Sequence, residues 1–233
     1  MADAEFRNAD ASGESQATET RSPLRVLFCH GLESGPTGKK VRHLEVHFAE
    51  VRCADMGMSL YSLGKENSLT RSFFRTFWQT SPWQWGAAAA EDSLTRCLEI
   101  QRAAIADFNP DVVVGSSWGG GIALLALAEG LWSGPTVAIA PALHRVLRDS
   151  GELKYKWAEV EQRLAASAHC LTLVHGAADD TIPIADSETL AAAIHCELVR
   201  VDGGDHGLND ALLNGRLREL VVQRHEAYQA STM

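Results

Sequence analysis

The chain has 233 residues, of which 45% are hydrophobic and 22% charged, which is typical of a soluble globular protein with a large core. The formal net charge of −9 argues against nucleic acid or an anionic membrane surface as a partner. No apolar run approaches the roughly 20 residues of a membrane-spanning helix, so we expect no membrane span.

Residues 1–22 mix acidic side chains with Ala, Ser and Thr. A secretory signal needs an apolar region, and an organellar transit peptide avoids acidic residues, so this segment fits neither. We therefore expect a disordered acidic leader, a cytoplasmic chain, and one domain over residues 23–233. The five cysteines form no C-x-x-C pair and no cluster with His, which predicts buried free thiols and no metal site.

Predicted strands and helices alternate along the rest of the chain, as the hydrophobic periodicity indicates. Such alternation implies an α/β fold, in which about six mainly parallel strands are covered by helices on both faces. The predicted strands span residues 24–29, 51–55, 112–114, 136–140, 171–174 and 197–201. Helical patterns cover residues 41–48, 87–108, 122–128, 153–164, 187–194 and 208–229.

Residues 111–122 hold the most informative motif. Gly115-Ser116-Ser117-Trp118-Gly119 fits G-x-S-x-G, with a buried strand before it and an apolar helix after it. This is the context of a nucleophile elbow, where a tight turn exposes a serine hydroxyl. Glycines frame Ser117 and not Ser116, so Ser117 is the predicted nucleophile.

The conspicuous polar clusters each follow a predicted strand: His30-Gly31, Ser117, Asp179 and His206. In a parallel sheet the carboxyl ends of the strands share one edge, so these clusters are expected to meet there. A serine hydroxyl becomes reactive when an imidazole takes its proton and a carboxylate orients that imidazole. The order Ser117, Asp179, His206 is the one expected of an α/β-hydrolase triad.

From residue 24 onward the chain resembles the α/β-hydrolase superfamily, without the first two strands of its sheet. Residues 175–183 are similar to the family's H-G-x-x-D-x-x-I/V-P loop, which implies Asp179 as the acid, and residues 204–206 resemble its G-x-H base loop. His30-Gly31-Leu32 resembles the oxyanion segment, which implies that the main-chain N–H groups of Leu32 and Trp118 hold the oxyanion. The stretch His30-Gly31-Leu32-Glu33-Ser34-Gly35-Pro36, followed by Lys39-Lys40, looks most like the small one-domain esterase and thioesterase branch.

This resemblance implies a cofactor-free serine hydrolase that cleaves a small acyl ester or thioester through an acyl-enzyme intermediate. Asp180 is an alternative acid, although the spacing to Pro183 favours Asp179. His30 and His175 are expected to be structural. The alternatives are a lactonase, a peptidase, a C–C hydrolase, or a non-catalytic small-molecule-binding or scaffold protein on the same fold.

Two insertions, residues 57–86 and 141–168, occupy cap-like positions, and the second is long enough only for a minimal helical lid. The first is rich in aromatic residues, which form either an apolar substrate wall or a satellite core. The candidate substrate-binding residues are Phe77, Trp78, Trp83 and Trp85.

Overall fold

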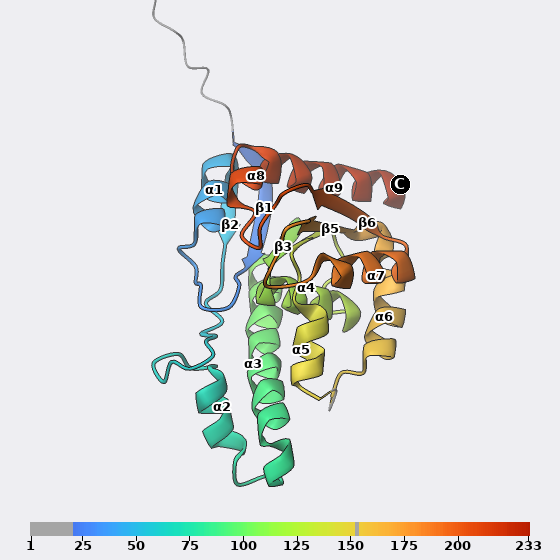
Figure 1. The fold of residues 1–233 in the computed structure, drawn as a ribbon. Helices are drawn as coiled ribbons and strands as arrows, with labels where there is room; N and C mark the ends of the chain where they lie inside the picture. The colour runs from blue at the N-terminus through green and yellow to red at the C-terminus, as the bar shows by residue number, and fades with distance from the viewer. Residues whose placement is uncertain (1–20, 152–153) are drawn as a thin grey trace, which may run out of the picture.

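The six predicted strands form one sheet in a computed structural model that describes residues 21–151 and 154–233 (Figure 1). All five strand pairings are parallel, and the strand order is β2-β1-β3-β4-β5-β6. The predicted six-stranded α/β architecture is therefore confirmed. The strands are β1 (Ser22–Cys29), β2 (Phe48–Arg52), β3 (Val112–Ser116), β4 (Thr136–Ile139), β5 (Leu171–Gly176) and β6 (Glu197–Val201).

The predicted leader lies mostly outside the described residues, which begin at Arg21. Its last residue, Ser22, is already the first residue of β1. None of the helices in the described part of the chain combines the length and the apolar character needed to cross a membrane.

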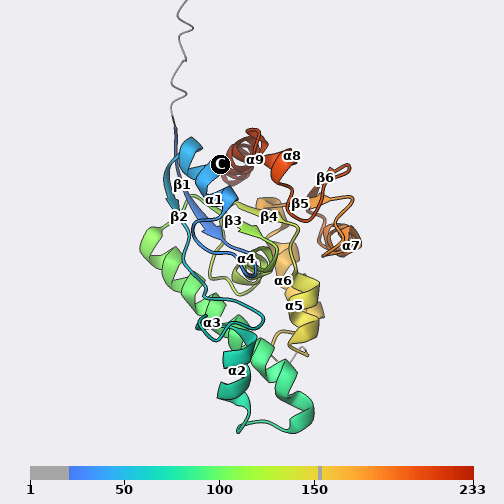
Figure 2. The ribbon, with the colours of Figure 1, turned by 60° about the vertical axis from the view of Figure 1, so that its left-hand side comes forward.

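Alternate side chains of the central strands enter two cores, one on each face of the sheet. On β1, Val26 and Phe28 belong to one core and Leu27 and Cys29 to the other, as the two-residue period of a strand requires. Helices α1 (Lys39–His47), α8 (Asn209–Leu212) and α9 (Arg216–Thr232) cover the first face. The other face is covered by α3 (Trp85–Phe108), α4 (Trp118–Ala128), α5 (Leu143–Asp149), α6 (Trp157–Ala166) and α7 (Ile184–Ile194), as Figure 2 shows.

After β2 the chain crosses to the other side of β1, so β3 and the later strands are added on the side opposite β2. β1 pairs with β2 on one side and with β3 on the other, so the loops that follow β1 and β3 lie side by side. In open parallel sheets such a switch point is where a ligand crevice forms. The topology therefore places residues 30–38 next to Ser117.

Several element boundaries differ from the sequence prediction, and two of the differences have a clear local reason. The second strand begins at Phe48 instead of residue 51, because α1 ends at His47 and the chain enters the strand without a turn. The last predicted helix is two helices, α8 and α9, separated at Gly215, where φ is 102°. A residue with that φ cannot continue a right-handed helix.

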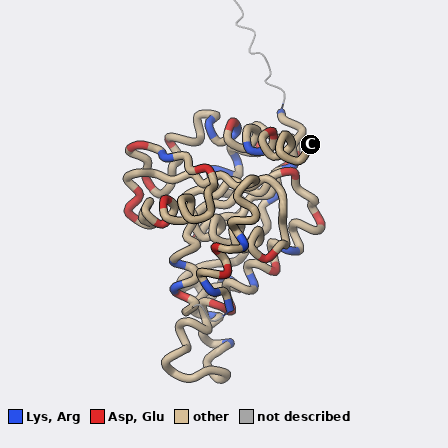
Figure 3. The backbone as a smooth tube through the Cα atoms, turned by 90° about the vertical axis from the view of Figure 1, so that its right-hand side faces the viewer, with Lys and Arg blue, Asp and Glu red and all other residues tan. Residues whose placement is uncertain are grey.

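Residues 57–86 form an arm beyond the carboxyl ends of the strands. Helix α2 (Leu69–Thr76) and the 3₁₀ turn Pro82–Gln84 pack against the first half of α3. The guanidinium of Arg75 on α2 donates to Asp92 of α3 at 2.7 and 2.9 Å, which links the two helices. The tip, residues 76–90, contains no charged residue and is tan throughout in Figure 3.

Helix α4 packs against the end of β1 with almost no space between the two backbones. A Cβ built on Gly119 would overlap the carbonyl group of Cys29 and lie only 2.5 Å from the His30 carbonyl oxygen. The neighbouring atoms belong to the backbone, so they cannot rotate away. Only glycine at this position permits the turn that carries Ser117.

We expect Gly119→Ala to lower the free energy of unfolding by about 3 kcal/mol or more, because overpacking against a fixed backbone is at the costly end of its range. The matched variant is Gly86→Ala, since nothing lies within 4 Å of a Cβ at that position. Gly86→Ala should leave stability unchanged or raise it by up to about 1 kcal/mol. Urea unfolding measures both, and equal destabilisation of the two variants would contradict the packing argument.

Candidate active site

Ser117 lies at the turn between β3 and α4, with φ 57° and ψ −120°. A non-glycine residue with positive φ is strained and persists only where its surroundings fix it. Here the Ser117 N–H donates to the Ile139 carbonyl at 2.9 Å, and its carbonyl accepts from the N–H groups of Gly121 and Ala142 at 3.1 and 3.0 Å. Ser117 lines the crevice, and so does Ser116, which is the buried last residue of β3.

Three side chains from distant loops form one hydrogen-bonded row. Ser117 Oγ lies 2.9 Å from Nε2 of His206, and Nδ1 of His206 lies 2.8 Å from Oδ2 of Asp179. These are the residues that the sequence predicts as nucleophile, base and acid, and the structure brings them together. A carboxylate that accepts from Nδ1–H leaves the Nε2 lone pair directed at the hydroxyl, which is the arrangement that activates a serine.

The Asp179 carboxylate is fully buried and saturated with donors. Its Oδ1 accepts from the main-chain N–H groups of Thr181 and Ile182, both at 2.9 Å. Burial alone would raise its pKa, but the hydrogen bonds from Ile182, His206 and Thr181 outweigh burial and hold the pKa below its ordinary value. Asp180 is exposed, and its carboxylate contacts the Thr181 hydroxyl instead of His206.

His175 lies directly behind the acid and is fully buried. Its Nε2 lies 3.1 Å from Oδ2 of Asp179 and 3.0 Å from the Ile182 carbonyl. Both partners accept hydrogen bonds, so Nε2 is the nitrogen that carries the proton, and Nδ1 accepts from the Ser187 hydroxyl at 2.7 Å. His175 therefore positions Asp179 and does not reach Ser117.

Hydrogen bonds to the Gly31 carbonyl and to the His30 ring fix the backbone of the segment after β1. The Gly31 carbonyl accepts from His30 Nδ1 at 2.9 Å and from the Ser34 hydroxyl at 2.8 Å, while His30 Nε2 accepts from the Met56 N–H at 2.9 Å. Because the peptide bond is trans, holding the Gly31 carbonyl on one side directs the Leu32 N–H to the other. His30 thus sets the orientation of one predicted oxyanion donor.

The second predicted donor, the Trp118 N–H, is the first amide of α4 and has no acceptor within its own helix. The two donor segments are close, because a Cβ on Gly31 would lie 3.3 Å from the Ser117 Cβ. The segment before Leu32 therefore lies beside Ser117, and Trp118 follows the serine directly in the chain.

A cavity of about 260 Å³ opens beside the Ser117 hydroxyl. None of the four predicted substrate-binding aromatic residues lines it. Trp78 and Trp83 are 87% and 85% exposed on the arm, and the rings of Phe77 and Trp85 pack together with centroids 4.4 Å apart. The residues that line the cavity besides Ser117 and His206 include Phe28, Gly31, Leu32, Lys39, Lys40 and Asn209.

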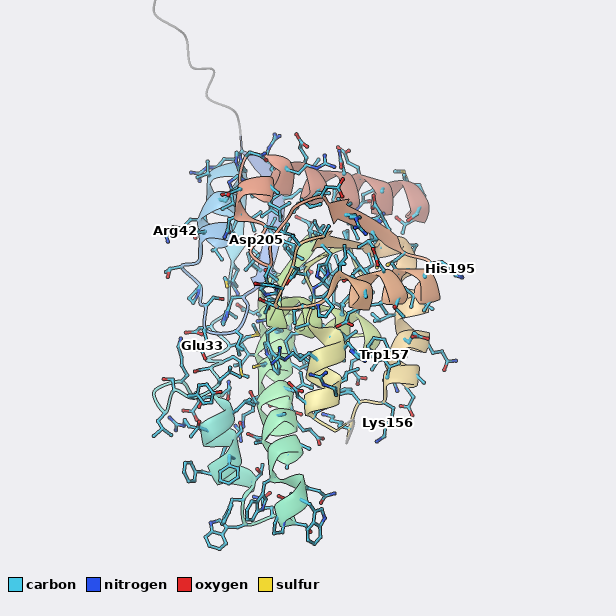
Figure 4. All side chains as sticks on the ribbon, viewed as in Figure 1. Glu33, Arg42, Lys156, Trp157, His195 and Asp205 are labelled. Carbon is cyan, nitrogen blue, oxygen red and sulfur yellow. The ribbon has the colours of Figure 1, made fainter. Side chains whose placement is uncertain are left out.

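Two residues near the site escaped the sequence prediction. Lys40 donates from Nζ to the Gly207 carbonyl at 2.6 Å. Glu33 accepts from the Ser59 hydroxyl and the Leu60 N–H at 2.8 and 2.7 Å, and these bonds, the backbone one first, lower its pKa (Figure 4). The available signal was the run of glycines and lysines directly after His30-Gly31.

The cysteines offer no competing nucleophile. All five are free, as predicted, but only Cys29, Cys97 and Cys170 are buried, while Cys53 and Cys196 are partly exposed. Desolvation raises the pKa of Cys53 and of Cys97 to about 12. A thiol with such a pKa is not ionised near neutral pH. Within residues 21–151 and 154–233, no group of three or more His, Cys, Asp and Glu side chains is arranged to hold a metal ion.

The lowered pKa of Asp179 makes part of the folding stability depend on pH. The folded carboxyl binds protons less readily than the unfolded one, whose pKa is about 3.9. Its contribution is therefore fully present above that value and is lost as the pH falls through the folded pKa.

We expect the unfolding free energy of Asp179→Asn to fall less steeply between about pH 5 and pH 3 than that of the wild type. Asp180→Asn should keep the wild-type slope in denaturant titrations, and equal slopes for all three proteins would contradict this assignment.

Comparisons with known proteins agree with the architecture. Est1E from Butyrivibrio proteoclasticus superposes with a TM-score of 0.56 at 17% identity, covering 89% of this chain and 88% of its own. A putative α/β-superfamily hydrolase from Xanthomonas campestris pv. campestris gives 0.52 at 22% identity, over 90% and 99% of the two chains.

The 2-hydroxy-6-oxo-6-phenylhexa-2,4-dienoate hydrolase of Rhodococcus sp. strain RHA1 gives a TM-score of 0.54 at 16% identity, over 85% and 90% of the two chains. No family model matches the sequence, and no curated protein matches it in a sequence search. The structural likeness and the sheet order together show that this chain has the α/β-hydrolase fold.

Proposed function

We propose that the protein is a serine hydrolase that cleaves a carboxylic ester or thioester of a small acyl substrate. The observation that carries this proposal is the row from Ser117 through His206 to Asp179, with distances of 2.9 and 2.8 Å. The row lies beside a cavity at the carboxyl edge of the sheet. The fold alone would not justify the proposal, since it also serves proteins without this chemistry.

In the first half of the reaction, Ser117 Oγ forms a bond to the acyl carbon while its proton moves to His206 Nε2. The negative charge on the carbonyl oxygen is held by the N–H groups of Leu32 and Trp118. The bond between the acyl carbon and the leaving oxygen or sulfur then breaks, and His206 gives its proton to that leaving atom. The products are an alcohol or thiol and an acyl-Ser117 intermediate.

Water then attacks the acyl-enzyme, with His206 taking one of its protons and returning it to Ser117 Oγ. The released acid carries the water oxygen, and the enzyme is regenerated without a cofactor. Asp179 stays ionised throughout and holds the imidazole in one orientation, which its lowered pKa favours. Solved structures of the same fold include esterases, which agrees with a hydrolase.

We expect Ser117→Ala to abolish labelling by a fluorophosphonate probe and to lower kcat on short p-nitrophenyl esters by about 10⁴-fold or more. Ser116→Ala is the matched control, since that residue is the last of β3 and the hydroxyl hydrogen-bonded to His206 belongs to Ser117. The variant should still be labelled. Full labelling of Ser117→Ala would rule out this nucleophile.

The acid is assigned by comparing two neighbouring carboxylates. Asp179→Asn should lower kcat by about 10⁴-fold, because the imidazole then takes the wrong tautomer. Asp180→Asn should change kcat less than about threefold, since exposed substitutions away from the site have small effects. A larger loss in Asp180→Asn would move the acid by one residue.

A wild type that turns over no acyl ester or thioester, yet is stabilised by such ligands in thermal melts, would favour the binding-protein alternative.

A further inference from the structure

The cavity beside Ser117 has a strongly basic wall. Lys39 and Lys40, the first two residues of α1, both line it, together with Asn209 at the start of α8. In the sequence, the two lysines come directly after the loop Ser34 to Gly38, which connects the Gly31–Leu32 segment to α1. Two positive charges therefore lie in the same small cavity as the proposed nucleophile.

Among the residues that the structure describes, neither ammonium group forms an ion pair with a carboxylate, and Lys40 is held by the Gly207 carbonyl alone. Burial lowers the pKa of Lys40, and the charge of Asp205 partly opposes that effect. A half-buried ammonium group that is bound to a neutral carbonyl and not to a carboxylate still has a desolvation cost, and an anionic ligand group would offset that cost.

The position of the lysines relative to His206 tells which part of a substrate they face. Lys40 bonds the carbonyl of Gly207, the residue next to His206, so the basic wall and the imidazole lie on the same side of Ser117. His206 must deliver its proton to the leaving atom, so the leaving group lies on that side as well. The free N–H groups at the start of α1 add the same sign of charge.

We propose that Lys39 and Lys40 form an anion subsite, which selects acyl substrates whose leaving group carries a carboxylate or phosphate. This inference rests on the proposed hydrolase function and names its substrate class. Lys39 is exposed at the mouth of the cavity and binds the anion directly. Lys40 lies deeper and both attracts the anion and positions the loop that carries His206.

The test compares two acetate esters that differ in one charge. One has 3-hydroxybenzoate as the leaving group, and the other has its methyl ester, so the phenols are similar but only the first is anionic. We expect wild-type kcat/KM to be about tenfold higher for the anionic ester, which is the effect of one charge-assisted hydrogen bond. That preference should shrink as salt is added, because ions screen the partly exposed lysines.

The variants give the result that decides the assignment. Lys39→Gln should lower the ratio of the two kcat/KM values by about tenfold, and Lys39→Glu should invert the preference. Arg42→Gln is the matched control, because Arg42 is on the same helix, carries the same charge and points outward in Figure 4. Its ratio should equal that of the wild type.

A wild-type ratio near one, or an equal fall in Arg42→Gln and Lys39→Gln, would overturn the subsite while leaving the hydrolase proposal intact. Turnover of neither ester, or turnover that survives in Ser117→Ala, would overturn both. Lys39 is exposed, so its substitution is not expected to disturb folding, and the ratio cancels any general loss of activity.

Discussion

The site depends on the contact of two backbones, where Gly119 of α4 lies against the carbonyl groups at the end of β1. This contact lets the chain turn within one residue, so Ser117 takes a positive φ that costs on the order of 1–3 kcal/mol. The cost is balanced locally, because the Ser117 N–H and carbonyl keep hydrogen-bond partners despite the turn. The same contact brings the loop after β1 next to the serine. One steric requirement thus positions both the hydroxyl and the segment with the proposed oxyanion donors.

Two buried histidines show that a structural residue can still govern a site. His30 holds the Gly31 carbonyl, and His175 holds the Asp179 carboxylate, so each orients a group that faces the reaction centre. Neither has a free ring nitrogen for a substrate, because each nitrogen already has a protein partner. Their effect is on geometry, and a site of this kind loses rate when a donor moves by a fraction of an ångström.

The strands and the three site loops were predictable because each is encoded within a few residues. Buried strands read as short β-branched runs, and the loops at Ser117, Asp179 and His206 have local signatures of glycine and polar residues. The arm was not predictable in the same way. Its aromatic side chains show that the segment packs somewhere, but whether Trp85 contacts a substrate or Phe77 depends on the direction of α3, which is a tertiary property. The break at Gly215 has a local signal, Asn-Gly, that the strong periodicity of its flanks obscured.

The net charge of the chain and the charge of the cavity have opposite signs. A formal charge of −9 repels anions at long range, but salt confines that repulsion to about 8–10 Å under physiological conditions. Lys39 and Lys40 line the cavity itself, and low-dielectric walls strengthen the field of such charges. An overall acidic surface therefore does not exclude an anionic substrate. The proposed selection acts inside the cavity, where a small anionic group can reach the lysines.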